Sequence, residues 1–139
     1  MPVPAEYQRI RDNFYAFLVD AREQSGLGSS HQTYTMVQGI FQVFRRRLEL
    51  KDAIRFAGVL PAGLRALFIA DWDVDEPRQL FESVAAMTRE VRMLREKHNF
   101  APESAIRDVA IALRRYVDAT AFEQILDKLP EEAAKFWQP

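Results

Sequence analysis

The sequence contains no cysteine, which excludes disulfide bonds and thiol chemistry and fits a reducing compartment. It also lacks an apolar run of the roughly 18 to 20 residues that a membrane-spanning helix needs. The first residues, from Met1 to Glu6, show no basic segment followed by an apolar stretch, so we expect no signal peptide. Together these features predict a cytoplasmic protein that does not contact a membrane.

The sequence also lacks a recognisable catalytic constellation. His31 and His98 have neither a second histidine nor a carboxylate four residues further on, as a helical metal motif would require. The serines show no nucleophile-elbow pattern, and no glycine-rich phosphate loop is present. We expect His98 to be a partly buried structural residue. We predict that the protein is not an enzyme and has no catalytic residue, cofactor or metal.

One acidic segment comes close to a calcium-binding pattern. Positions 1, 3, 5 and 12 of an EF-hand loop would be filled by Asp71, Asp73, Asp75 and Glu82. Position 6 should be glycine to allow a sharp turn, but it is Glu76, and the following Pro77 biases that residue towards extended geometry. Acidic residues ahead of a helix are explained by favourable charge at its N-terminus. We therefore predict no tight calcium site.

The sequence is rich in apolar residues with a helical period. Hydrophobic residues make up 48% of the chain, which is enough for a compact core. Apolar positions spaced three and four apart predict helices over residues 5–24, 30–48, 51–57, 61–70, 77–97 and 102–117. A seventh helix is predicted to begin at a Thr120–Glu123 capping box and an eighth at Pro130. Strand signals are absent, so the predicted fold class is all-α.

The second half of the chain repeats the hydrophobic pattern of the first, 69 residues further on. Val37, Ile40, Phe41, Phe44 and Leu48 recur as Ile106, Val109, Ala110, Leu113 and Val117. The Leu60-Pro61 step recurs as Leu129-Pro130. Such self-similarity indicates a duplicated structural unit. We predict a single domain over residues 1–139, made of pseudo-repeated units at 5–70 and 77–138 joined by an acidic linker at 71–76. Each unit is expected to be a helical hairpin followed by two short helices that meet at Leu-Pro.

The two Leu-Pro segments also carry a family resemblance. The residues concerned are Leu60, Pro61, Leu64, Arg65, Leu67, Phe68, Asp71 and Trp72, then Leu129, Pro130, Phe136 and Trp137. With these motifs, the chain resembles the bacterial family catalogued as domain of unknown function 2267. The resemblance implies a small, all-helical bacterial protein. It supplies no activity, cofactor or catalytic residue to transfer to this chain.

The densest basic cluster is Arg45-Arg46-Arg47, with Arg55 nearby. Three consecutive residues on a helix fan over about 200°, so they cannot all face one phosphate backbone. The ordinary interpretation is that their stems pack on the protein while the charged groups remain in water. The alternative is a nucleic-acid contact through these four arginines, which the pI of about 6.1 does not favour.

The two tryptophans, Trp72 and Trp137, each follow the last short helix of a unit. We expect Trp72 to cover the seam between the units and Trp137 to close the second one; a tryptophan left exposed would mark a partner site. Residues 1–70 carry a net charge of +3, from nine Lys/Arg and six Asp/Glu, and residues 71–139 carry −4, from ten and fourteen. The favoured function is a non-catalytic protein-interaction or oligomerisation module. The alternatives are nucleic-acid binding and a ligand-binding bundle with a cavity between its units.

Overall fold

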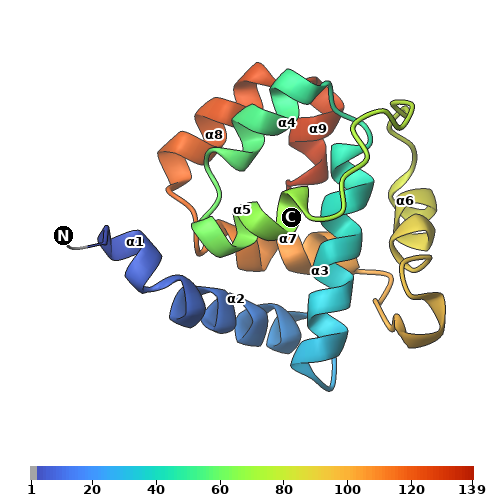
Figure 1. Cartoon of the computed structure of the whole chain (residues 1–139). Helices are drawn as coiled ribbons and strands as arrows, with labels where there is room; N and C mark the ends of the chain where they lie inside the picture. Colours follow the sequence, from blue (N-terminus) through green and yellow to red (C-terminus); the bar gives the residue numbers. More distant parts are fainter. Residues whose placement is uncertain (1–2) are drawn as a thin grey trace.

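The computed structural model describes residues 3–139, and within this range it is entirely helical (Figure 1). Its elements are α1 (Ala5–Gln8), α2 (Ile10–Ser25), α3 (Ser30–Arg45), α4 (Leu50–Ala57), α5 (Ala62–Ile69), α6 (Val84–Val91), the 3-10 helix η1 (Glu96–His98), α7 (Ala105–Arg114), α8 (Ala119–Lys128) and α9 (Glu131–Phe136). The all-α prediction is confirmed. No helix of the described range is long and apolar enough to cross a membrane.

The helix ends of the first half follow local signals in the sequence. Gly26 ends α2 in the left-handed conformation, with φ of 76°, and its N–H donates to the carbonyl of Arg22. The hydroxyl of Ser29 then caps α3 by accepting a hydrogen bond from the N–H of Gln32. The segment expected to be one helix over 5–24 is divided at Arg9 into α1 and α2.

The prediction of one long helix over residues 77–97 is wrong. Residues 77–83 form no helix, and α6 begins only after Ser83, whose hydroxyl accepts from the N–H of Ala86 at 3.1 Å. The N–H of Gln79 donates instead to the carbonyl of Arg46 at 2.9 Å, which holds the segment extended against the end of α3. Leu80, assigned to the apolar stripe of that helix, is consequently 79% exposed.

The start of α8 also differs from the prediction. Its cap is Asp118, whose carboxylate accepts from the N–H of Ala121 at 2.8 Å. Thr120 and Glu123 therefore form no capping box, because the helix already begins at Ala119. The structure thus caps this helix two residues earlier than the sequence pattern predicted.

Helices of one half pack on helices of the other half. Helix α2 packs mainly on α7, and α3 packs on α6 as well as on α2 and α5. Helix α4 lies beside α8, and α8 beside α9 (Figure 1). The approach of α3 to α6 requires Gly39, since a Cβ atom there would lie 2.9 Å from the carbonyl oxygen of Val91.

The centre of the molecule is an aromatic core. Its fully buried large side chains include Phe17, Phe41, Phe44, Phe56, Phe68, Phe122 and Trp137. The ring of Phe44 lies 4.8 Å from that of Phe56 and 4.9 Å from that of Phe136, between centroids. The predicted stripe of α3, including Phe44, is therefore core.

Three helix boundaries recur with the 69-residue spacing of the sequence pattern. Helices α3 and α7 end at Arg45 and Arg114, α4 and α8 begin at Leu50 and Ala119, and α5 and α9 begin at Ala62 and Glu131. Helix α6 is shorter than α2, so the first helices of the two halves do not correspond in length. A superposition of residues 37–48 on 106–117 stays a prediction.

Candidate functional site

Arg45, the last residue of α3, is a buried cap for α5. Its Nη1 donates to the carbonyl oxygens of Phe68 and Ala70, each at 2.8 Å, which are among the last carbonyls of α5 and otherwise lack partners. Burial first, and next the charge of Arg46, lowers the pKa of Arg45. The guanidinium is therefore used inside the fold, and the expectation that its charged group lies in water is wrong.

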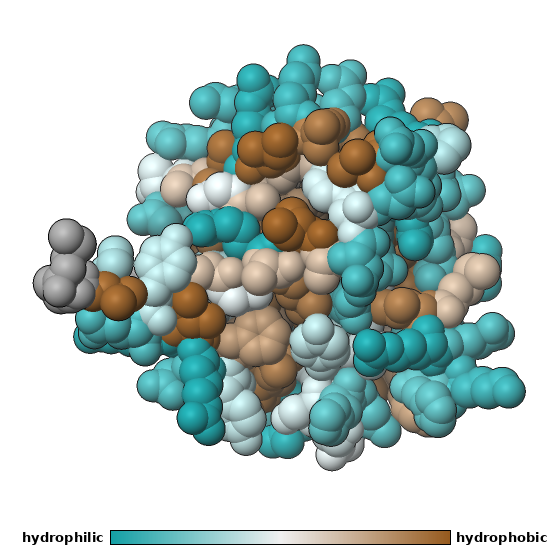
Figure 2. Space-filling model, viewed as in Figure 1, coloured by the Kyte–Doolittle hydropathy of each residue, from teal (hydrophilic) through white to brown (hydrophobic). Residues whose placement is uncertain are grey.

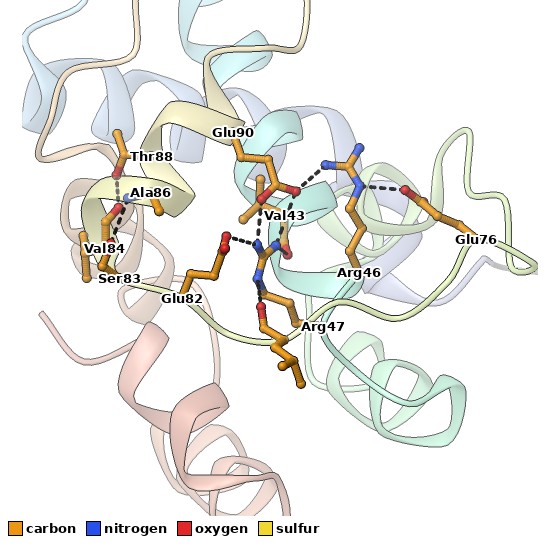
Figure 3. Close-up of polar contacts among 11 residues, drawn as sticks. Val43, Arg46, Arg47, Glu76, Glu82, Ser83, Val84, Ala86, Thr88 and Glu90 are labelled. Atoms are coloured by element: carbon orange, nitrogen blue, oxygen red, sulfur yellow. Dashed lines mark hydrogen bonds and ion pairs between the residues drawn. The ribbon is translucent and has the colours of Figure 1, made fainter.

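Arg47 is also buried, in a network that joins α3 to the segment before α6 (Figure 3). Its Nη2 lies 2.7 Å from Oε2 of Glu90 and 3.2 Å from Oε2 of Glu82. Its Nε donates to the carbonyl of Leu80 at 3.0 Å, and its Nη1 to the carbonyl of Val43 at 2.8 Å. These bonds occupy the donors that would otherwise bind a phosphate, so Arg47 is not a surface residue.

Arg46 completes the same network from the neighbouring position. Its Nη1 lies 2.9 Å from Oε1 of Glu90, and its Nε lies 3.2 Å from Oε1 of Glu76 (Figure 3). Burial raises the pKa of Glu90, but the hydrogen bonds and charges of Arg47 and Arg46 outweigh this effect and lower that pKa overall. Glu90 is thus held ionised between two guanidinium groups.

Arg55 is separate from these three arginines. It lies on α4 with about half of its side chain exposed, and it pairs with Asp52 at 3.3 Å. The four predicted contact residues therefore do not form one basic surface: Arg45 and Arg47 are interior, Arg46 is partly covered, and Arg55 faces solvent. This placement gives no support to a phosphate-binding role for the group.

The position equivalent to Arg45 in the second half has the same role. Arg114 donates through Nε to the carbonyl of Trp137 at 3.0 Å, 23 residues further on, just as Arg45 donates to Phe68 over 23 residues. Arg114 also pairs with Glu123. The recurrence of these arginines was visible in the sequence, but their capping role was not, because it depends on contacts far along the chain.

The positions of the two tryptophans differ from those expected from the sequence. Trp137 is fully buried, and its ring stacks on Phe56 with centroids 5.4 Å apart and packs on Phe44 at 5.3 Å. It therefore joins the second half of the chain to the first, which was the role expected of Trp72, and it is not accessible to a partner.

Trp72 is only partly buried and lies at the edge of an exposed apolar surface. Its ring packs edge-on against Phe68 at 6.3 Å, and the guanidinium of Arg45 lies 5.4 Å from the ring centroid. Leu50 and Val74 line one hollow with it. Exposed apolar residues gather over α4 and α5 in the view of Figure 2.

We call this surface the Trp72 patch, made of Leu50, Ile54, Trp72 and Val74. Leu50, Ile54 and Val74 are 51%, 61% and 60% exposed, and Leu50 and Ile54 are neighbours on one face of α4. Val74 and Glu76 of the linker line a hollow with Leu50, to which Arg78 also contributes. On α4, Lys51 and Arg55 directly follow Leu50 and Ile54 and are also exposed.

The acidic linker is used for backbone and ion-pair contacts. Asp73 accepts a hydrogen bond from the N–H of Asp75 at 3.0 Å, and Glu82 is engaged by Arg47. Within residues 3–139, no three His, Asp or Glu side chains are grouped as a metal site. Glu82, the residue needed to close a calcium loop, is directed instead to the buried arginine.

His98 is exposed, so the prediction of a partly buried histidine is wrong. The neighbouring Asn99 is buried in its place, and its Nδ2 donates to the carbonyls of Val91 and Leu94, both at 2.8 Å. The two histidines, His31 and His98, line one shallow surface hollow. Sequence reasoning missed Asn99, for which no pattern gave a signal.

A cavity of about 330 Å³ lies between α2 and the start of α5. Arg65 and Tyr116 are among its lining residues. The hydroxyl of Tyr116 donates to the carbonyl of Ala16 at 3.1 Å. Burial first, and then the charge of Asp20, raises the pKa of Tyr116, so its hydroxyl remains a protonated donor at neutral pH.

Comparison with known proteins agrees with the resemblance noted from the Leu-Pro motifs. No protein of curated function matches the chain significantly. The family model described as "Uncharacterized conserved protein (DUF2267)" matches residues 14–136, which include every helix from α3 to α9. Since this match covers most of the chain, the protein belongs to the DUF2267 family.

Proposed function

We propose that the protein is a non-catalytic interaction module that associates with a second copy of itself through the Trp72 patch. The observation that carries the proposal is the exposure of Leu50, Ile54 and Val74 around a half-buried tryptophan. Clustered exposed apolar residues with an aromatic anchor are typical of interaction sites.

The choice of a second copy as the partner rests on charge complementarity. On one side of the patch, the acidic residues Asp73 and Asp75 flank Val74 in the chain; on the other side, the basic residues Lys51 and Arg55 follow Leu50 and Ile54 on α4. In a twofold dimer the same surface is used by both copies, so the acidic edge of one faces the basic edge of the other. In such a dimer the acidic and the basic residues of each copy would therefore both face residues of opposite charge.

The area that a stable dimer requires indicates an extended contact. A stable dimer buries about 800 Å² from each partner, more than four side chains supply. The proposed contact accordingly includes the charged edges as well as the apolar patch.

The first test is the mass in solution, measured by sedimentation equilibrium over a range of concentrations. We expect the wild type to reach twice 16.1 kDa and Ile54→Glu to remain monomeric. Val84→Glu is the matched control, since Val84 is 59% exposed at the start of α6, outside the patch. A monomeric wild type, or equal effects of the two substitutions, would refute self-association through this surface.

The second test addresses the charged edges. Lys51→Glu with Arg55→Glu should weaken the dimer at least about tenfold, because each acidic edge then faces like charge. Adding Asp73→Lys and Asp75→Lys in the same chain should restore association. Failure of the second pair to compensate for the first would show that the two edges do not meet.

A further inference from the structure

The cavity between α2 and α5 has the character of a small-molecule site. Its volume of about 330 Å³ lies at the lower end of the range of ligand pockets. The apolar part of its lining consists mainly of Ile10, Phe14, Phe17, Leu60 and Leu64. Tyr116 contributes from the second half of the chain, so the cavity adjoins both halves.

Arg65 supplies a positive charge at this cavity. Its Nε donates to the carbonyl of Ala57 at 3.2 Å and its Nη2 to the carbonyl of Leu60 at 2.9 Å, which fixes the guanidinium in place. In the described part of the chain no carboxylate forms an ion pair with it, whereas Arg46 and Arg47 each contact two. Among the described residues, this partly buried cation beside the cavity therefore has no carboxylate counter-ion.

The first turn of α5 adds N–H donors to the same cavity. Pro61 precedes the helix and gives no side-chain cap, so the N–H groups of Ala62, Gly63 and Leu64 have no partner from the helix itself. Their partial positive charge favours an anion. Gly63 allows α2 to pack closely on this turn, since a Cβ atom there would lie 2.9 Å from the ring of Phe14.

The second half of the chain offers an internal comparison. Counting 69 residues on from Gly58, Gly63 and Arg65 leads to Asp127, Glu132 and Ala134, whereas the Leu-Pro step is kept as Leu129-Pro130. Helix α9 begins at the corresponding residue without an arginine to hold the preceding turn. Arg65 is thus not required for a short helix after Leu-Pro; in the first half it holds the carbonyls that follow α4 and also places a positive charge at the cavity.

We propose that this cavity binds a small carboxylate with an apolar body. The carboxylate lies against the guanidinium of Arg65 and the first N–H groups of α5, and the body packs on Phe14 and Ile10. Burial of the body and charge-assisted hydrogen bonds to the carboxylate together provide the affinity. This role is independent of self-association through the Trp72 patch.

The test is an NMR titration of the ¹⁵N-labelled protein with phenylacetate, acetate and phenylacetamide. We expect saturable shifts for phenylacetate at the amides of residues 58–60, 62–65 and 116. Acetate lacks the apolar body and phenylacetamide lacks the charge, so both should bind at least about tenfold more weakly. Equal binding of the amide, absence of saturation, or shifts scattered outside the cavity would overturn the proposal.

Substitutions then separate the charge from the fold. Arg65→Gln should reduce phenylacetate affinity at least about tenfold, and Arg65→Lys should retain most of it. Arg107→Gln, on the exposed face of α7, is the matched control and should have no effect. Affinity unchanged in Arg65→Gln would refute the assignment of the carboxylate to this residue.

A second variant fills the space without removing a core contact. Asn13 is exposed on α2 and lines the cavity, so Asn13→Trp should abolish phenylacetate binding while thermal unfolding stays close to that of the wild type. A folded Asn13→Trp variant that binds phenylacetate as tightly as the wild type would show that the ligand lies elsewhere.

Discussion

Replacing Glu90 by glutamine removes the central acid of the arginine network while keeping its shape. The carboxylate contacts Arg47, whose side chain is fully buried, at 2.7 Å and Arg46 at 2.9 Å. Removing one partner of a buried ion pair costs about 3–5 kcal/mol, because a buried charge is left unpaired. In the Glu90→Gln variant, Arg47 still contacts Glu82 and two carbonyl acceptors. We therefore expect the free energy of unfolding to fall by about 2–3 kcal/mol.

The measurement is the free energy of unfolding in urea together with the melting temperature. For a domain of this size the expected loss corresponds to a decrease of about 7–10 °C. Glu123→Gln is the control, because the side chain of Glu123, which pairs with Arg114, is more than half exposed. This exposed ion pair should contribute less than about 1 kcal/mol to the free energy of unfolding. Equal losses in the two variants would show that burial of the Glu90 pairs contributes nothing.

The same substitution has a distinct pH signature. Because the pKa of Glu90 is lowered in the folded state, its ionised form stabilises the protein above the ordinary value of 4.5. This contribution is lost as pH falls through the folded-state pKa. The stability difference between wild type and Glu90→Gln should therefore shrink in acid, and a difference independent of pH would contradict the assignment.

Three other results are expected. Phe44→Ala should lower the free energy of unfolding by about 3–5 kcal/mol, since the ring is fully buried, whereas Tyr15→Ala, at a 60% exposed position, should have little effect in the same urea titration. Calorimetry should detect no micromolar calcium binding, because Glu82 is engaged by Arg47; binding that Glu82→Gln abolishes would overturn this. Acrylamide should quench the wild-type fluorescence partly and that of Trp72→Phe hardly at all, because Trp137 is buried; strong quenching of the variant would contradict the core position.

Much of the fold could be predicted because the relevant signals are local. Helix caps at Gly26 and Ser29 and the Leu-Pro steps depend on residues within a few positions of the helix end. The apolar stripe of α3 was also readable, since a helix that packs on several neighbours is apolar over a wide face. The residues of this stripe lie in the core, as expected from the sequence.

The segment before α6 could not be predicted, because its conformation is set by residues over 30 positions away. Pro77, Leu80 and Val84 fit a helical spacing, but hydrogen bonds from Arg47 to Leu80 and from Gln79 to Arg46 hold the chain extended. The same long-range contacts account for the buried arginines. A sequence pattern records that Arg45 and Arg47 are charged, but it does not record which carbonyls and carboxylates they meet.

The 69-residue spacing distinguishes arginines whose capping role recurs in both halves from Arg65, which is present in the first half only. Arg45 and Arg114 both end a helix and both donate to a carbonyl 23 residues on, so their shared chemistry is explained by capping alone. Arg65 has no counterpart at Ala134, although the Leu-Pro step and the helix start recur there. Its bonds to the carbonyls of Ala57 and Leu60 hold the turn after α4, but among the described residues no carboxylate neutralises its charge beside the cavity. The carboxylate titration is therefore directed at Arg65 and not at the denser cluster of residues 45–47.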